Sequence, residues 1–563
     1  MQVTVNNYAM KKIVHFQKFI FFTLFIGLFV VAGLGDVATE FSELVILDSG
    51  RPKPLDTFAR ESLTRITKRA SWKGPNGEKM DAMTFLIYFA FKGGDWQHEK
   101  IIRCDYLPLK AILDLDMGAK FFSWSELVSN EKVSELARKL FNTRDQTVNE
   151  RKLASELSAI IEAINRLELV ANPRSWKVIP PNSHAGRWLS VDEASGLREL
   201  DQVVKAWTDL GMAISKDEPE LMRSAIKQFK DSLLAARIDI YKQDWKFRLE
   251  VFYNKIHPFR ISWVLSFLAF FIILVSSSDK TSKKYWLYWP GVTAFGFSVL
   301  MQVLGFTLRV LISGRAPVTN MYEVMVWTAF GAGLLALIFE LVYRQKYLVL
   351  AAAAVATPAM ILADFLPTVF DPGIQPLVAV LRSNYWLAIH VVTITMGYSG
   401  FLFSLGISHL ALGYILFKPG ESKIINNLTH FNNRILQTGV LFLAAGIVLG
   451  GLWAEKSWGR FWGWDPKETW SLIALLSYLA ILHAKHIGWI NVFGLNAGSV
   501  ICFQTIVMAA YGVNYILGKG LHSYGFGVGG EIAVVIFIVL EIIFIIFASI
   551  KRKKLIPINL SKE

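Results

Sequence analysis

Residues 386–417 read WLAIHVVTITMGYSGFLFSLGISHLALGYILF, a stretch with no Asp, Glu, Lys or Arg. A helix needs about 20 consecutive apolar residues to cross roughly 30 Å of hydrocarbon. This stretch is long enough and apolar enough to predict a membrane-spanning helix. The whole chain shares its character, because 53% of the 563 residues are apolar and the mean hydropathy is positive.

Nine further apolar runs indicate that this helix belongs to a polytopic protein. They lie at residues 19–35, 261–275, 286–312, 322–343, 347–366, 435–453, 470–483, 498–517 and 531–550. One soluble core does not need so much apolar sequence, whereas about ten transmembrane helices do. The sequence therefore predicts an all-α integral membrane protein.

The spacing of these runs predicts four regions. Residues 1–35 form an N-terminal transmembrane anchor, 36–260 a mainly helical extracytoplasmic domain, 261–550 a transmembrane domain, and 551–563 a basic tail. Residues 19–35 also resemble a cleaved secretory signal, but no small-residue cleavage site follows them, which favours an anchor.

Within the extracytoplasmic domain, two stretches are patterned as helices and one as an extended segment. Residues 150–169 and 218–252 have helical patterning. Residues 51–57, RPKPLDT, predict an extended entry, because proline and the residue before it avoid helix. Its His98 and His184 lie in polar surroundings typical of exposed loops, and we assign them no site.

The net charge of +14 is distributed in a way that sets the orientation of the helices. Basic residues gather in the segments that alternate on one side of the predicted spans, and the positive-inside rule makes that side cytoplasmic. Both termini are then cytoplasmic, residues 36–260 lie outside, and nucleic acid is not expected as a partner. The basic segments contain Lys11, Lys12, Lys18, Lys280, Lys283, Lys284, Arg344, Lys346, Lys418, Lys423, Lys485 and Lys551 to Lys554. The large outward domain and the basic inner loops favour the cytoplasmic (inner) membrane of a bacterium over a thylakoid membrane.

The cysteine content excludes several functions. Cys104 and Cys502 are the two cysteines of the chain, so it has no disulfide framework and no CxxC pair. The chain is therefore not itself a thiol reductant, and without CxxCH it is not a covalent c-type cytochrome.

Residues 453–470 carry the densest chemical signal. They read WAEKSWGRFWGWDPKETW and lie outside the membrane in the predicted topology, with five tryptophans in eighteen residues. An aromatic belt at the membrane interface explains one or two of them. Indole faces that stack on a planar macrocycle, with glycines that allow close approach, explain the whole set better. This segment is predicted to form a shelf for a porphyrin.

Three histidines are placed to bind haem iron, for which a neutral imidazole is the usual protein ligand. His390 and His522 lie near the outer ends of their spans, at the level of the tryptophan-rich segment. His483 lies at the inner end of the span 470–483, where packing or snorkelling is an alternative explanation. The two outer histidines on one face predict a bis-histidine site.

These segments resemble a known family. WGRFWGWDPKETW resembles the tryptophan-rich WWD signature of haem-handling proteins, and its DPKETW ending is similar to the CcsA branch of the system II cytochrome c synthases. The resemblance runs from about residue 253 to 550. Its other segments, in the same order, are GRAPVTNMYEV, LRSNYWLAIHVVTITMGY, LHAK and GVNYILGKGLHSYGF.

The resemblance implies roles for individual residues. His390 and His522 would be the axial ligands of haem iron at the outer site, and His483 a ligand at a transit site deeper in the membrane. The shelf of the outer site would be formed by Trp458, Trp462, Trp464, Asp465 and Trp470.

The resemblance also implies a function. Haem b with reduced iron would cross to the outer site and present its vinyl groups to the CxxCH motif of an apocytochrome c. The enzyme, a cytochrome c haem lyase or synthase, would act mainly by positioning.

The resemblance implies partners as well. In the family, the second transit histidine belongs to a CcsB (ResB) part, which this chain lacks, so a separate CcsB-like membrane protein is expected; His15 is a weaker candidate for the second histidine. A thiol-reducing protein is a possible further partner. His257 is interpreted as structural, and the partner of Glu541, deep in the last span, stays open.

Other classes of protein fit less well. A haem exporter or chaperone would share the tryptophans and the outer histidines, but is expected to lack the DPKETW ending. An electron-transfer cytochrome b holds haem between buried histidines of facing spans. A non-haem transporter leaves the tryptophan-rich segment unexplained.

Overall fold

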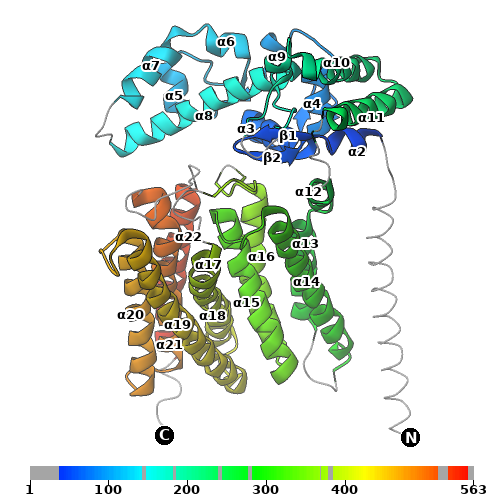
Figure 1. Ribbon diagram of the computed structural model, residues 1–563. Coiled ribbons are helices and arrows are strands. Elements are labelled where there is room, and N and C mark those ends of the chain that lie inside the picture. The colour runs from blue at the N-terminus through cyan, green and yellow to red at the C-terminus, as the bar shows by residue number, and fades with distance from the viewer. Residues whose placement is uncertain are drawn as a thin grey trace, which may run out of the picture.

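The computed structural model describes residues 37–75, 77–142, 147–181, 186–236, 238, 244–276, 282–367, 369–377, 384–517 and 530–555. The predicted first span, His15, His184 and His522 lie outside these residues. What is described consists of a helical domain set above a bundle of long helices (Figure 1). The predicted all-α membrane architecture is confirmed.

The N-terminal domain, predicted to be extracytoplasmic and named the extracytoplasmic domain below, is built from helices and three short antiparallel hairpins. Its helices are α2 (Val37–Ser42), α3 (Leu55–Thr67), α4 (Ala82–Phe91), α5 (Leu107–Ile112), α6 (Trp124–Val128), α7 (Glu131–Phe141), α8 (Val148–Ala171), α9 (Val191–Ala194), α10 (Asp201–Lys216) and α11 (Pro219–Ala235). The hairpins pair β1 (Val45–Asp48) with β2 (Arg51–Pro54), β3 (Trp72–Lys73) with β4 (Lys79–Met80), and β5 (Ile102–Arg103) with β6 (Phe121–Phe122).

Local sequence explains these elements. The prolines of RPKP place residues 51–54 in strand β2, which confirms the predicted extended entry for these four residues. The prediction is wrong for residues 55–57, which form the first turn of α3. The predicted helix 150–169 is confirmed as α8, and Thr147 and Glu150 form a capping box at its start. At the centre of the domain, Trp176 is fully buried against Phe58 and Trp207.

The helical patterning predicted for residues 218–252 corresponds to two helices in the structure. The structure has α11 ending at Ala235 and a separate α12 (Asp244–Ile256). α11 buries Phe229 and Leu233 in the domain core, whereas α12 packs against β2, α3 and α14. The chain forms two helices here because the apolar residues of each pack against a different part of the molecule.

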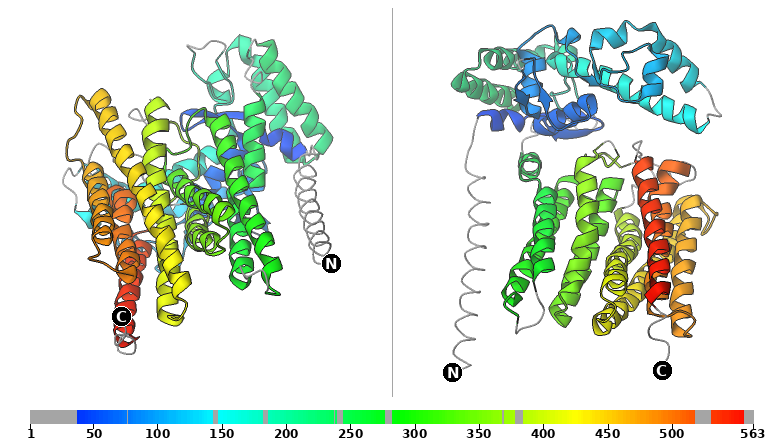
Figure 2. Two further views of the ribbon diagram at one scale, coloured as in Figure 1. Left: turned by 90° about the horizontal axis from the view of Figure 1, so that it is seen from below. Right: turned by 180° about the vertical axis from the view of Figure 1, so that it is seen from behind.

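The membrane domain consists of long helices that run side by side (Figures 1 and 2). They are α13 (Pro258–Val275), α14 (Tyr288–Ser313), α15 (Met321–Tyr343), α16 (Tyr347–Phe365), α18 (Val392–Phe417), α19 (Ser422–Trp458), α20 (Pro466–His486), α21 (Val492–Val507) and α22 (Glu531–Leu555). Among the described residues, eight helices are long and apolar enough to cross a membrane, and they match eight predicted runs. The predicted span 470–483 corresponds to α20, which is less apolar and packs against α19 and α21.

Helix α18 lies at the centre of the bundle and contacts α15, α16, α19, α21 and α22. Small residues make this close packing possible, as is common between membrane helices. A Cβ added at Gly397 would meet the backbone of Leu443 on α19, and one at Gly406 would meet the carbonyl oxygen of Ala351 on α16. Helix α18 is thereby held closely between α19 and α16.

The junction between the two domains is polar. Arg51 on β2 forms a two-point ion pair with Glu250 on α12, with contacts of 2.6 and 2.9 Å. His257 connects α12 to α13 with a φ of 50°, directly before Pro258 at the start of α13. It lines a junction cavity of about 750 Å³, separate from the site below.

Both cysteines are buried. Cys104 in the extracytoplasmic domain is 2% exposed, and Cys502 on α21 is 8% exposed. Burial raises the pKa of the Cys104 thiol. Each domain therefore contains one thiol that solvent does not reach in the folded state.

Candidate functional site

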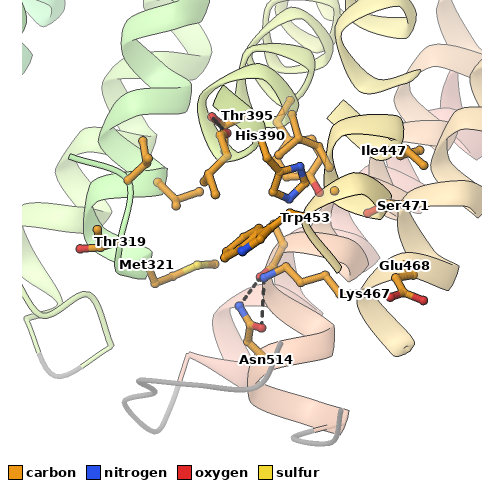
Figure 3. Close-up of a pocket in the computed structure, with 18 of the residues that line it drawn as sticks. Thr319, Met321, His390, Thr395, Ile447, Trp453, Lys467, Glu468, Ser471 and Asn514 are labelled. Atoms are coloured by element: carbon orange, nitrogen blue, oxygen red, sulfur yellow. Dashed lines mark hydrogen bonds between the residues drawn. The ribbon is translucent and has the colours of Figure 1, made fainter. Parts of the chain in front are cut away.

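A cavity of about 130 Å³ lies where α18, α19, α20 and the start of α15 come together. It brings together residues that are far apart in the sequence (Figure 3). They are Val318–Met321, Val324, His390, Val391, Ile394, Thr395, Tyr398, Ile447, Gly450, Gly451, Trp453, Phe461, Trp462, Lys467, Glu468, Ser471, Ala510 and Asn514. The lining is mostly apolar, with His390, Lys467 and Glu468 as its ionisable side chains.

His390 reaches the cavity from a widened helical turn. Residues Leu387–Val391 form a π-helical segment, η7, at the outer end of α18, after the short helix α17 (Asn384–Trp386). A second π-helical segment, η8 (Met508–Leu517), carries Asn514 on another wall. Such segments are rare and occur often at functional sites, because the extra residue in the turn reorients side chains.

The tautomer of His390 suits a metal ligand. Its Nδ1 lies 2.9 Å from the carbonyl oxygen of Gly446, which can only accept a hydrogen bond, so Nδ1 carries the proton. In that tautomer the ring lone pair is on Nε2. A ligating histidine commonly donates its other N–H to a backbone carbonyl in this way.

Glycines of α19 make room for the ring. A Cβ added at Gly450 would lie 2.6 Å from Cε1 of His390, so no other residue fits there without displacing the imidazole. The neighbouring Gly451 is covered by the ring of Phe461 in the same way. The spacing of Gly446, Gly450 and Gly451 therefore fixes the position of His390.

The tryptophans of the segment 453–470 divide into two groups. Trp453 is 3% exposed and its ring centroid lies 5.6 Å from that of His390, and Trp462 also lines the cavity. Trp458 stacks on Trp453 from outside, at 6.4 Å between centroids, and Trp464 is 71% exposed. Trp470 lies on α20 and does not line this cavity.

The tryptophan-rich loop is shorter than the stretch 453–470. Helix α19 continues to Trp458 and α20 begins at Pro466, so only residues 459–465 connect them. Asp465 caps α20 and is 5% exposed; its carboxylate accepts the backbone N–H of Lys467 at 3.0 Å. This carboxylate holds the first turn of α20 in place.

Two charged side chains of α20 lie at the cavity. Glu468 accepts hydrogen bonds from Arg460 at 3.1 Å and from the backbone N–H of Gly463 at 2.8 Å. Lys467 reaches Oδ1 of Asn514 at 3.3 Å. Burial lowers the pKa of Lys467 to about 8, against the opposing effect of Asp465.

His483 lies at the other end of α20, sixteen residues from Lys467 and therefore about 24 Å along the helix axis. Its side chain is exposed, and its Nδ1 donates to the carbonyl oxygen of Leu479 at 2.7 Å. Among the described residues, the structure thus brings His390, Trp453 and Trp462 together and places His483 on the opposite side of the bundle. The position of His522 lies outside the described residues.

Several residues of the cavity were not singled out by the sequence. Lys467 is part of the DPKETW motif, and Asn514 lies in the segment GVNYILGKGLHSYGF, but nothing in the sequence showed that they meet. A glycine spacing on α19 was the available signal for the histidine cradle. The start of α15, Val318–Met321, contributes because α15 contacts α18.

Comparison with known proteins identifies the family. The model of the family described as "Cytochrome C assembly protein" matches residues 318–522, which include most of the segments that line the cavity. The chain is 31% identical to the cytochrome c biogenesis protein CcsA of Synechococcus sp. (strain CC9902), over 48% of this chain and 98% of that protein. The chain belongs to the CcsA family.

Two other relatives extend this result. CcsA of Chlamydomonas reinhardtii is 33% identical over 41% of this chain and 67% of its own length. Protein NrfI of Wolinella succinogenes is 28% identical over 88% of this chain, so that similarity includes most of the extracytoplasmic domain. The chain spans 55% of the length of NrfI. The CcsA family resemblance is confirmed, as is a role in cytochrome c biogenesis.

Proposed function

We propose that this chain binds haem b, as substrate, in the cavity beside His390 and presents its vinyl groups to the CxxCH motif of an apocytochrome c. The observation that carries the proposal is the Nδ1 hydrogen bond from His390 to Gly446, which sets the ligating tautomer beside Trp453 in an apolar cavity. Membership in the CcsA family supports the same reading.

The attachment reaction balances without a further co-reactant. Each cysteine S–H adds across one vinyl group, so that a C–S bond forms, the proton goes to the other vinyl carbon, and the double bond is lost. The histidine of CxxCH then replaces one axial ligand of the reduced iron. The contribution of the chain is to hold the two reactants in register, a positioning effect worth several kcal/mol.

The remaining parts of the proposal concern the second ligands and the partners. His522 supplies the second outer ligand, and His483 takes haem at a transit site near the inner surface. A CcsB-like membrane protein completes that site. A thiol-reducing protein keeps the CxxCH cysteines reduced, and the inner membrane of a bacterium is the proposed location.

Absorption spectra test the ligands. Protein co-produced with a CcsB-like partner is purified in detergent as wild type, His390→Gly, His522→Ala and His483→Ala. His98→Ala is the control, because His98 is exposed in the extracytoplasmic domain. We expect a reduced low-spin spectrum in the wild type and the control, its loss in His390→Gly and His522→Ala, and its recovery in His390→Gly with added imidazole. Unchanged spectra in both outer variants would overturn the ligand assignment.

Covalent attachment separates synthesis from export. A reporter apocytochrome with one CxxCH motif is co-produced, and haem that survives denaturation is measured on a gel. We expect attachment with the wild type and less than about a tenth of it with His390→Gly, since losing an aligned ligand removes the positioning effect. If the wild type bound haem but attached none, the chain would be a haem exporter or chaperone.

A further inference from the structure

The cavity beside His390 contains one basic side chain. Of the residues that line it, Lys467 alone is a lysine or arginine, and Glu468 alone is a carboxylate. The rest of the lining is apolar or uncharged, apart from the imidazole of His390. Each charge in such a place needs a partner, because burying an uncompensated charge is costly.

The carboxylate of Glu468 is already compensated. Its Oε1 accepts from Arg460 at 3.1 Å, and its Oε2 accepts from the backbone N–H groups of Gly463 at 2.8 Å and Asp465 at 3.2 Å. These contacts turn the carboxylate toward the loop 459–465. Glu468 therefore does not form an ion pair with Lys467 in the cavity.

The ammonium group of Lys467 is compensated less well than the carboxylate of Glu468. Its hydrogen bond in the described structure is to the neutral amide of Asn514, at 3.3 Å (Figure 3). The carboxylate of Asp465 caps the backbone of the same helix turn. The lowered pKa, about 8, agrees with a cation whose charge is only partly compensated. An anionic group entering the cavity would supply the missing charge.

We propose that Lys467, held by Asn514, binds a propionate carboxylate of the substrate haem and so sets which edge of the macrocycle faces the cavity wall. The inference rests on the proposed function, since it names the part of haem that this wall recognises. Haem b carries its two propionates on one side of the ring and its vinyl groups on the other. A charge-assisted bond at Lys467 therefore turns the vinyl groups away from α20, toward an incoming thiol. Lys467 is thus a residue that determines orientation.

The test compares two porphyrins on the full chain. Protein with its CcsB-like partner is isolated from haem-deficient cells and titrated with iron protoporphyrin IX or with its dimethyl ester, in which both propionates are neutral. Binding is followed by the Soret band. The variants are Lys467→Gln, Lys467→Arg and, as a control, Lys456→Gln. Lys456 lies in the last turn of α19 and is exposed. The change Lys456→Gln removes the same charge as Lys467→Gln, from the same end of the bundle.

In the wild type we expect the ester to bind about 10- to 100-fold more weakly than haem, the range for a hydrogen bond to a charged group. Lys467→Gln should bind haem as weakly as the wild type binds the ester and should show no preference between the two. Lys467→Arg and Lys456→Gln should keep the preference.

Three outcomes would overturn the inference. Equal affinity of the wild type for both porphyrins would show that no propionate is bound. A loss in Lys467→Gln that is the same for haem and ester would show that the lysine only supports the fold of α20. Failure of the wild type to bind either porphyrin would remove the proposed function, and the inference with it.

Discussion

The extracytoplasmic domain buries a charged cluster, whereas the membrane domain buries a network of amides and hydroxyls together with an ion pair of Arg309 on α14 with Glu323 on α15 at 2.6 Å. In the former, Asp48 accepts from Lys53 at 2.9 Å and from Arg166 at 2.7 Å, and Lys53 is fully buried. In the latter, Asn432 donates to Ser408 and to Asn496, each at 2.9 Å.

The difference follows from the surroundings of each domain. A domain in water can desolvate a few charges when opposite charges surround them, although the net gain is small. A helix bundle in lipid gains from close backbone packing and from neutral hydrogen bonds, and it places ionisable groups only where they have partners. Glu541 on α22 follows this rule, since its Oε2 lies 3.0 Å from Nε2 of His409 on α18. The comparison teaches that one chain uses two separate sources of stability.

The two cysteines allow each domain to be tested alone. In a Cys502→Ser background, thiol labelling reports opening around Cys104, and in a Cys104→Ser background it reports opening around Cys502. All labelling is measured on full-length protein in detergent.

The largest effect is expected for Asp48→Asn. This change leaves the buried Arg166 without its carboxylate partner, whereas Lys53 keeps Glu61 at 2.7 Å, so the expected loss is about 3 kcal/mol. Cys104 should become labelled at least about 100-fold faster, while Cys502 should not change. An equal increase at both cysteines would show that the two domains open together and are not stabilised separately.

The next effect concerns packing in the bundle. Gly406→Ala places a methyl group against the carbonyl oxygen of Ala351, which should cost up to about 3 kcal/mol. Cys502 labelling should therefore accelerate. Gly413→Ala on the same helix is the control, because a Cβ there meets nothing within 4 Å. If both variants behaved alike, close approach between α16 and α18 would not determine stability.

Acid should remove one stabilising contribution from the extracytoplasmic domain, that of Asp48. Burial would raise the pKa of Asp48, but Arg166 and Lys53 outweigh it and lower that pKa to about 2. The charged carboxylate therefore stabilises the folded domain above its ordinary pKa of 3.8, and this contribution, about 2 kcal/mol, is lost as the pH falls from 3.8 toward 2. Labelling of Cys104 with a dipyridyl disulfide, which reacts in acid, should show this loss in the wild type. Asp48→Asn should lack this component, and a profile identical to the wild type would contradict the assignment.

The smallest effect is expected for Asn432→Leu. Neutral hydrogen bonds between membrane helices contribute about 1 kcal/mol, so Cys502 labelling should rise only several-fold. The adjacent Asn433→Leu is the matched control, since Asn433 is only partly buried, whereas Asn432 is buried. An effect as large as that of Asp48→Asn would show that amides, too, are critical to the bundle.

Much of the fold was predictable because hydropathy identifies spans directly. Nine predicted runs correspond to described helices, and eight of these helices are long and apolar enough to cross a membrane, but α19 begins at Ser422 rather than near residue 435. Its first turns carry Asn426, Asn427 and Asn433, which lower the hydropathy without breaking the helix. Hydropathy reports the part of a helix in lipid and misses the part that projects beyond it.

The site was predictable only in part. His390 and the tryptophans stood out by residue type, yet the cradle of Gly446 and Gly450 depends on how α18 crosses α19. The pairing of His409 with Glu541 joins residues 132 positions apart, and Lys467 meets Asn514 across 47 positions. Such contacts follow from tertiary packing, which a local pattern does not contain.

The burial of both cysteines has a consequence for the chemistry proposed above. A protein that holds the vinyl groups of haem beside incoming thiols could also react with them through its own cysteines. Cys104 and Cys502 are both enclosed, and burial keeps the Cys104 thiol protonated and therefore a poor nucleophile. The chain has no exposed thiol of its own, so in the proposed reaction only thiols brought by another polypeptide can add to the vinyl groups.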